Sequence, residues 1–93
     1  MPNYWQRFHI ESLLGESLRG RKKFGDAEPH LKEGYEGMWQ RADKIPAPLK
    51  RHLTEAGERI VRLYDEWGKP EEAAKWRAKL ASELPAKNNE PKP

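Results

Sequence analysis

The sequence predicts an all-α domain of four helices that form two helical hairpins. Apolar residues recur at three- and four-residue steps along most of the chain, and no stretch shows the two-residue period of a β-strand. A pattern of apolar and small residues also occurs twice, with an offset of 46 positions. The matched pairs are Leu14 with Ile60, Leu18 with Tyr64, Phe24 with Pro70, and Ala27 with Ala73. Such a repeat predicts a duplicated helix–turn–helix unit, which typically builds a binding scaffold rather than an active site.

The composition excludes several other classes of protein. The 93 residues are enough for one domain, and the four tryptophans among nine aromatic residues argue against general disorder. Cysteine is absent, which excludes disulfides, thiolate metal sites and cysteine nucleophiles. The sequence contains neither a signal peptide nor an apolar run of about 20 residues, so we expect a cytoplasmic protein without a membrane segment.

Four segments have helical periodicity. We expect helices over residues 3–20, 24–43, 48–67 and 70–83. In the first segment, the apolar residues that recur at three- and four-residue steps are Tyr4, Trp5, Phe8, Leu13, Leu14 and Leu18. In the second segment, Pro29 is expected in the first turn of the helix. Gly34 lies on the apolar stripe, where it predicts the close approach of another helix. The apolar pattern does not explain Gly37. Residues 1–84 are therefore expected to form one helical domain, and the proline-rich residues 85–93 a disordered tail.

The residues at the repeated positions follow a known order. The first unit contains Leu14-Gly15, Leu18, Ala27 and Leu31, and the second contains Tyr64, Ala73 and Pro85. This order resembles the tetratricopeptide (TPR) repeat, and the resemblance implies two stacked TPR-like hairpins. The chain departs from the TPR pattern in its period, which is 46 instead of about 34 residues. It also departs at the conserved positions occupied here by Glu11, Gly57, Val61 and Arg77.

Several separated blocks of sequence occur in a second recognisable order. They are Ser12-Leu13-Leu14-Gly15, Lys22-Lys23-Phe24, Ala27-Glu28-Pro29, Gly34-Tyr35-Glu36-Gly37, Lys44-Ile45-Pro46 and Leu63-Tyr64-x-x-Trp67-Gly68-Lys69-Pro70. They resemble the C-terminal TPR segment of planctomycete-type bacterial serine/threonine protein kinases. The chain has none of the kinase catalytic motifs, so we expect no enzymatic activity, and no catalytic, cofactor or metal residue is assigned. The resemblance leaves open whether the chain is a free-standing protein or the tail of a larger one.

The resemblance to TPR proteins also implies a partner-binding surface. In that family the first helix of each unit lines a concave groove, and the corresponding positions here are His9, Ser12, Glu16, Arg19, Glu55, Arg59, Arg62 and Asp65. Their chemistry suits a protein or peptide of mixed charge, because an arginine can hold a carboxylate through two hydrogen bonds. The alternative is a solvated face with ion pairs along the third helix, Glu55 with Arg59 and Glu58 with Arg62.

The sequence leaves further interpretations open. The chain can be a structural cap or oligomerisation element that closes a longer helical solenoid, because two units expose the apolar ends of a short solenoid. Trp5 is expected near the open N-terminal end, and Trp39 falls just off the apolar stripe of the second helix. A homo-oligomer or docking onto adjacent TPR units would cover such ends. The basic residues Arg19, Arg21, Lys22, Lys23, Lys50 and Arg51 form a weaker candidate for nucleic-acid binding. The histidine–carboxylate pairs His30 with Asp26 and His52 with Glu55 each supply two ligands, too few for a closed zinc site.

Overall fold

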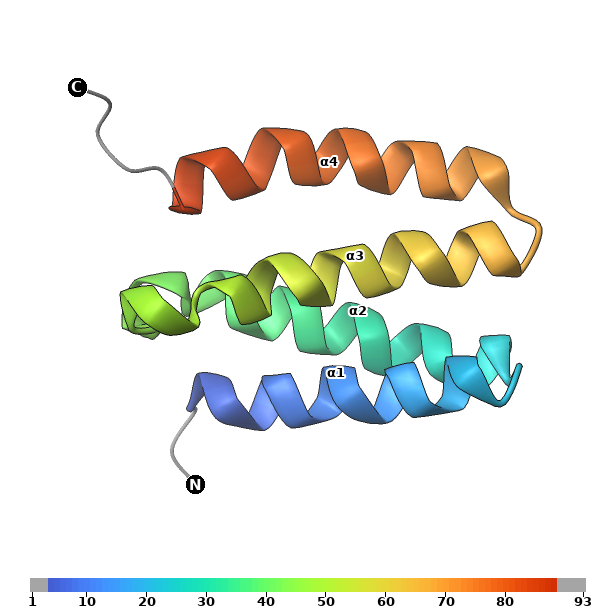
Figure 1. Cartoon of the computed structure of the whole chain (residues 1–93), viewed down its shortest axis with the longest axis horizontal. Coiled ribbons are helices and arrows are strands. Elements are labelled where there is room, and N and C mark those ends of the chain that lie inside the picture. Colours follow the sequence, from blue (N-terminus) through green and yellow to red (C-terminus); the bar gives the residue numbers. More distant parts are fainter. Residues whose placement is uncertain (1–3, 89–93) are drawn as a thin grey trace.

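The computed structural model describes residues 4–88, with side chains through Leu84, and is almost entirely helical within that range (Figure 1). Its α-helices are α1 (Trp5–Gly20), α2 (Phe24–Gln40), α3 (Arg51–Glu66) and α4 (Pro70–Asn88). Two short 3-10 helices, η1 (Ala42–Lys44) and η2 (Ala47–Leu49), connect α2 to α3. No strand occurs among these residues, so the predicted all-α class with four helices is confirmed.

The backbone repeats with the period that the sequence predicted. Helix α3 begins and ends 46 residues after α1, and α4 begins 46 residues after α2. Each hairpin turn contains one residue with positive φ at the same place in the repeat, Lys22 at 62° and Gly68 at 76°. The next residue in each turn donates its amide to a carbonyl five residues earlier, Lys23 to Leu18 at 2.9 Å and Lys69 to Tyr64 at 2.8 Å. The chain is therefore a duplicated helical hairpin in its backbone geometry as well as in its sequence.

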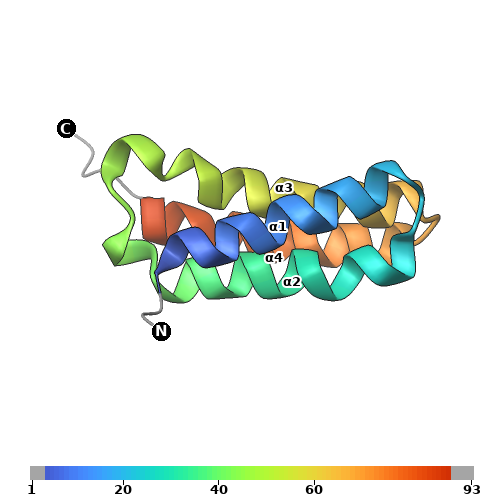
Figure 2. The same cartoon turned by 90° about the horizontal axis from the view of Figure 1, so that it is seen from below.

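The two hairpins pack side by side into a thin plate of about 40 × 34 × 17 Å. Helices α1 and α4 lie at opposite edges of this plate, with α2 and α3 between them (Figure 1). Viewed from the α1 edge, α2 and α3 lie on opposite sides of the line that joins α1 to α4 (Figure 2). Helix α3 therefore packs against the first hairpin on one side and against α4 on the other.

The core is one continuous apolar cluster that joins the two hairpins. Two buried tyrosines bridge it. The Tyr64 hydroxyl donates to Glu28 Oε2 at 2.5 Å, and the Tyr35 hydroxyl donates to Glu83 Oε1 at 2.8 Å. Burial, reinforced by the hydrogen bond to a carboxylate, raises the pKa of both phenols far above the ordinary value. These bonds satisfy the polar ends of two large core side chains and fix the second hairpin on the first.

Two glycines of α2 allow α1 to approach closely. A Cβ at Gly34 would lie 2.7 Å from the backbone nitrogen of Ser12 and 2.8 Å from the carbonyl oxygen of Phe8. A Cβ at Gly37 would overlap the ring of Phe8. The predicted close approach at Gly34 is confirmed. The apolar pattern did not explain Gly37, but the structure does, because the ring of Phe8 packs directly against this glycine.

Helix α1 buries a different face from the one expected. Its buried positions are Trp5, Phe8, Ser12 and Gly15. Three apolar residues point outward instead, and their exposed fractions are 66% for Ile10, 43% for Leu13 and 47% for Leu14. The reason is the close contact with α2, which admits only small residues at the inward positions in the middle of α1. Tyr4, Leu13 and Leu14, which belong to the apolar pattern of the first predicted helix, therefore lie outside the core.

Several helix boundaries differ from expectation. Helix α2 begins at Phe24 as expected but ends at Gln40 rather than at residue 43, and α3 begins at Arg51 rather than at residue 48, because η1 and η2 occupy the connection. The carbonyl of Lys23 already accepts the amide of Ala27 at 2.9 Å, so Pro29 lies inside α2 rather than in its first turn. Helix α4 continues through Asn88, beyond the expected end at residue 83. Leu84 is buried against the core and holds this last part of the helix in place. The first four residues of the expected tail are thus helical, and residues 89–93 lie outside the described part of the chain.

Candidate partner-binding surfaces

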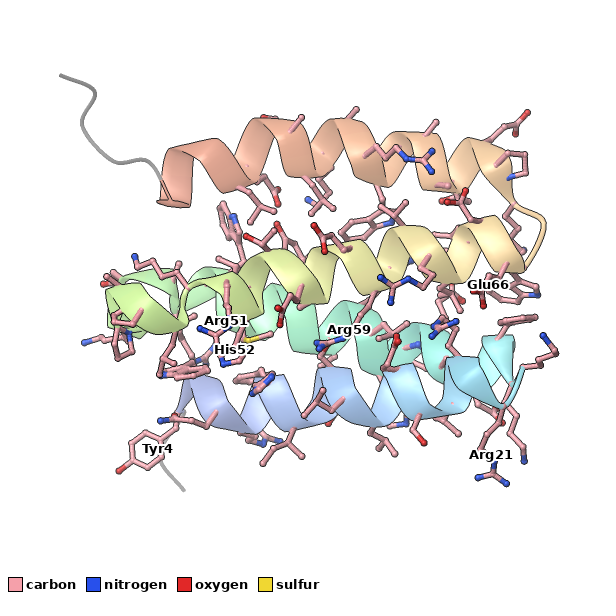
Figure 3. All side chains as sticks on the ribbon, viewed as in Figure 1. Tyr4, Arg21, Arg51, His52, Arg59 and Glu66 are labelled. Atoms are coloured by element: carbon pink, nitrogen blue, oxygen red, sulfur yellow. The ribbon has the colours of Figure 1, made fainter. Side chains whose placement is uncertain are left out.

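The residues predicted for the partner groove lie mainly along the facing edges of α1 and α3. Figure 3 shows His52, Arg59 and Glu66 on the edge of α3 that faces α1. Side-chain hydrogen bonds cross between the helices: Arg59 Nη1 to Ser12 Oγ at 3.0 Å, Arg62 Nη1 to Glu16 Oε2 at 3.2 Å, and Arg19 Nη1 to Glu66 Oε1 at 2.6 Å. The structure therefore brings the predicted residues together, but they bind one another.

Arg19 and Glu16 form the best-defined ion pair of this surface. Arg19 Nε donates to Glu16 Oε1 at 3.1 Å, and Arg19 Nη2 donates to Glu16 Oε2 at 2.7 Å. The hydrogen bonds from Arg19 lower the pKa of Glu16 and outweigh burial, which acts in the opposite direction. The same bonds raise the pKa of Arg19. The pair stays fully ionised at neutral pH, and its partial exposure limits its contribution to stability to about 1 kcal/mol or less.

Two expectations about this surface were wrong. Ser12 was placed in the groove, but it is fully buried, because α1 approaches α2 closely there and Arg59 covers it from α3. The alternative ion pairs within α3 do not form among the described residues. Arg59 and Arg62 instead reach across to α1, where they donate to Ser12 and Glu16.

His9 lies in a small stack of rings at one end of the α1–α3 edge. Its ring centre is 4.2 Å from that of His52 and 6.1 Å from that of Trp5. Burial lowers the pKa of His9, and the neighbouring His52 and Arg59 lower it further. The predicted groove residue Glu55 lies beside these rings, with Oε1 3.5 Å from His52 Nδ1, and its charge acts to raise the pKa of His9 without offsetting the lowering. Asp65 is engaged elsewhere, with Oδ2 2.7 Å from Arg77. The stack therefore favours a neutral imidazole at His9.

A second surface, which was not predicted from the sequence, lies between α3 and α4. It is an open groove with a volume of about 620 Å³. Apolar side chains form much of its lining, Val61 from α3 and Leu80, Ala81 and Leu84 from α4. Charged residues of both signs line the rest, Glu58, Arg62, Asp65 and Arg77, together with Thr54. An apolar groove with a charged rim suits an amphipathic helix. Only Arg62 and Asp65 belong to both surfaces.

The basic residues proposed for nucleic acid do not form one patch. Arg21 lies at the hairpin-turn end of the molecule and Arg51 at the opposite end (Figure 3). Arg19 is already held by Glu16 and Glu66. A continuous stripe of cations, which phosphate binding requires, is therefore missing from the described residues that were proposed for it.

Within residues 4–88, no cluster of three or more histidine, aspartate or glutamate side chains is suitable for a metal ion. The proposed pair of His30 with Asp26 is replaced by a contact between His30 Nδ1 and Glu11 Oε2 at 2.5 Å. Over the same range, no helix combines the length and the apolar character that crossing a bilayer requires.

These observations define an all-α protein of two packed helical hairpins with an open groove on the second. Comparisons with protein-family models, with curated proteins and with solved structures found no match. The functional assignment therefore depends on the geometry and on the sequence pattern.

Proposed function

We propose that the protein is a non-catalytic protein–protein interaction module in which the α3–α4 groove binds an amphipathic helix of a protein partner. The observation that carries this proposal is the apolar lining of Val61, Leu80, Ala81 and Leu84 between charged residues of both signs. The apolar part gives a partner helix somewhere to bury its apolar face, and the rim restricts how that helix is oriented. The TPR resemblance supports the same class of function, and the absence of cysteine is consistent with the proposed cytoplasmic location.

The groove is short, which limits the expected affinity. Burying one large apolar side chain contributes about 1.5–3 kcal/mol, and a groove of this size receives two or three of them. Part of that gain is offset by the lost freedom of the two partners. We therefore expect dissociation constants in the range of about 1 µM to 1 mM for a single helix.

A second candidate function is that of a structural cap or oligomerisation element for a longer helical solenoid. The exposed apolar residues Ile10, Leu13 and Leu14 favour it, because they give the outer face of α1 the character of an uncovered helix interface. The resemblance to the C-terminal TPR segment of bacterial serine/threonine kinases suggests the kind of larger protein in which such an element would function. Nucleic-acid binding is the weakest candidate, since its basic residues lie at both ends of the plate.

The groove proposal is tested by titrating the ¹⁵N-labelled protein with a designed helical peptide that carries leucines at positions i, i+3, i+4 and i+7. A peptide of the same composition in permuted order is the control. We expect saturable chemical-shift changes at Val61, Leu80 and Ala81 only with the amphipathic peptide. The Ala81→Glu variant places a charge in the groove and should weaken binding at least about tenfold. Ala78→Glu, exposed on α4 outside the groove, should bind as the wild type does.

Two results would contradict the proposal. One is the absence of saturable shifts up to about 1 mM peptide, which lies at the weak end of the affinity expected for this groove. The other is binding that Ala81→Glu and Ala78→Glu affect equally, because the peptide would then not occupy the groove.

A further inference from the structure

We propose that the partner helix of the α3–α4 groove is α1 of a second copy of this chain, so that copies associate head to tail. This inference rests on the proposed function of the groove and names its occupant. It follows from a comparison of the two hairpins, position by position, at the 46-residue offset that their backbones share.

The contact between the two hairpins within one chain shows how a helix docks on a hairpin of this type. In α3, Ala56, Ile60 and Leu63 are fully buried in the core. Arg59, on the same side of the helix, donates to Ser12 of α1. Helix α3 thus uses a stripe of these four positions to pack against the first hairpin.

The same stripe on α1 is uncovered. The positions 46 residues earlier are Ile10, Leu13, Leu14 and Ser17, and all four are exposed. The three apolar members have exposed fractions of 66%, 43% and 47% in that order. Helix α1 therefore carries an apolar docking stripe equivalent to that of α3, with nothing among the described residues to cover it.

The groove is the other half of the same interface. Its residues Glu58, Arg62, Asp65 and Ala81 correspond at the 46-residue offset to Ser12, Glu16, Arg19 and Tyr35. Ser12, Glu16 and Arg19 make side-chain hydrogen bonds to α3 of the second hairpin. Tyr35 is covered by the second hairpin, since its ring makes an edge contact with Trp76. The α3–α4 groove is thus the surface on which a following helix would pack.

The two uncovered surfaces fit one another because each repeats one side of the internal interface. Charge also matches. Within the chain, Arg62 of α3 pairs with Glu16 of α1. Suppose that α1 of a second copy docks on the groove as α3 docks on the first hairpin. Glu16 of the second copy then lies at the position that Arg62 has in the internal contact. The groove residue Arg62 lies at the position that Glu16 has there. Opposite charges therefore meet again with the roles exchanged. The contact is heterologous, so it leaves one free α1 face and one free groove at the ends of every assembly.

The test uses two variants of the full chain, each with one surface disabled. Leu14→Glu charges the α1 stripe, and Ala81→Glu charges the groove; both positions are exposed, so both variants should fold as judged by circular dichroism. Sedimentation equilibrium should show the wild-type mass rising above the 10.9 kDa of one chain as the concentration increases. Across about 10 µM to 1 mM, each variant alone should associate at least about tenfold more weakly. Ala78→Glu, outside the groove, should associate as the wild type does.

Mixing the two variants gives the decisive result. Leu14→Glu keeps an intact groove and Ala81→Glu keeps an intact α1, so an equimolar mixture should form heterodimers and nothing larger. A mixture that stays monomeric would overturn the proposal, as would an Ala81→Glu protein that still dimerises through α1 against α1. A wild-type chain that is monomeric at every concentration would also overturn it.

Peptide binding by the groove is measured separately from self-association. The designed peptide is titrated into Leu14→Glu, which keeps the groove but lacks the α1 stripe. Peptide binding by this variant together with a monomeric wild type would retain the proposed function and reject self-association. Failure of both measurements would reject both proposals.

Discussion

Replacement of Gly34 by alanine tests the close packing of α1 on α2 directly. The added Cβ would lie 2.7 Å from the nitrogen of Ser12 and 2.8 Å from the carbonyl oxygen of Phe8. These are backbone atoms of α1, so no side-chain rotation relieves the overlap. The first hairpin can accommodate the methyl group only if the two helices separate along this contact.

The expected magnitude follows from two opposing effects. Alanine is favoured over glycine inside a helix by about 1 kcal/mol, which stabilises the variant. Overpacking a close contact costs about 1–3 kcal/mol, and contact with rigid backbone places Gly34 near the upper end of that range. We therefore expect Gly34→Ala to lower the free energy of unfolding by about 1–2 kcal/mol. For a domain of this size, each kcal/mol corresponds to about 4–8 °C in Tm.

Gly25→Ala is the matched control, because a Cβ there meets no atom within 4 Å. It should leave the stability unchanged or raise it by up to about 1 kcal/mol. Urea unfolding followed by circular dichroism measures both variants against the wild type. If Gly34→Ala were as stable as Gly25→Ala, the close approach of α1 and α2 would be incorrect.

Three further outcomes are expected from the turns and the buried polar groups. Lys22→Gly should raise the free energy of unfolding by about 0.5–1 kcal/mol, because φ is 62° at this position. Gly68→Ala, at φ 76° in the other turn, should lower it by about 1 kcal/mol. Equal effects of the two substitutions in urea unfolding would contradict the shared turn geometry. Tyr64→Phe removes the donor to Glu28 and should lower the free energy of unfolding by about 1 kcal/mol. Because the pKa of this phenol is raised in the folded protein, the stability of the wild type should decline above pH 10 more than that of the variant. Parallel profiles of stability against pH would argue against the buried hydrogen bond. The pKa of His9 is lowered in the folded protein, so its contribution to folding stability is complete above pH 6.5 and is lost as the pH falls below that value. Thermal melts between about pH 7.5 and 5.5 should show a smaller loss of stability for His9→Gln than for the wild type. An equal dependence of Tm on pH in the two proteins would exclude His9 as a cause.

The sequence predicted the repeated architecture well because its signals are local. Helical periodicity, the 46-residue offset and the turn glycine Gly68 depend on residues close together in the chain, and the helix bounds of α1 and α3 follow the same offset. The close approach at Gly34 was also predictable, since a glycine on an apolar stripe usually marks a contact between helices.

The inward face of α1 and the binding surface could not be predicted in the same way. The inward positions Ser12 and Gly15 are small and weakly apolar, so the more apolar Leu13 and Leu14 determined the predicted stripe. Only the packing against α2 shows that large residues do not fit there.

The α3–α4 groove depends on where α4 lies relative to α3, and that placement is a tertiary property. The apolar residues Leu80 and Leu84 give no signal of their own, because they are partly core and partly groove lining. A signal did exist in the 46-residue offset, which relates most groove residues to buried residues of the first hairpin. It becomes interpretable only once the burial of both sets is known.

The unequal surroundings of the four helices also have a consequence for local unfolding. Helix α4 forms one edge of the plate and packs less extensively on α3 than α1 does on α2. Helices with few neighbours open at a lower free energy than the rest of a domain, so amide hydrogen exchange should be fastest along α4. A helix seated in the groove would contact α4 from its uncovered side and slow that exchange. Occupancy of the groove and the opening of α4 are thereby thermodynamically linked, and exchange rates along α4 report binding even when the bound partner is too weakly held to isolate.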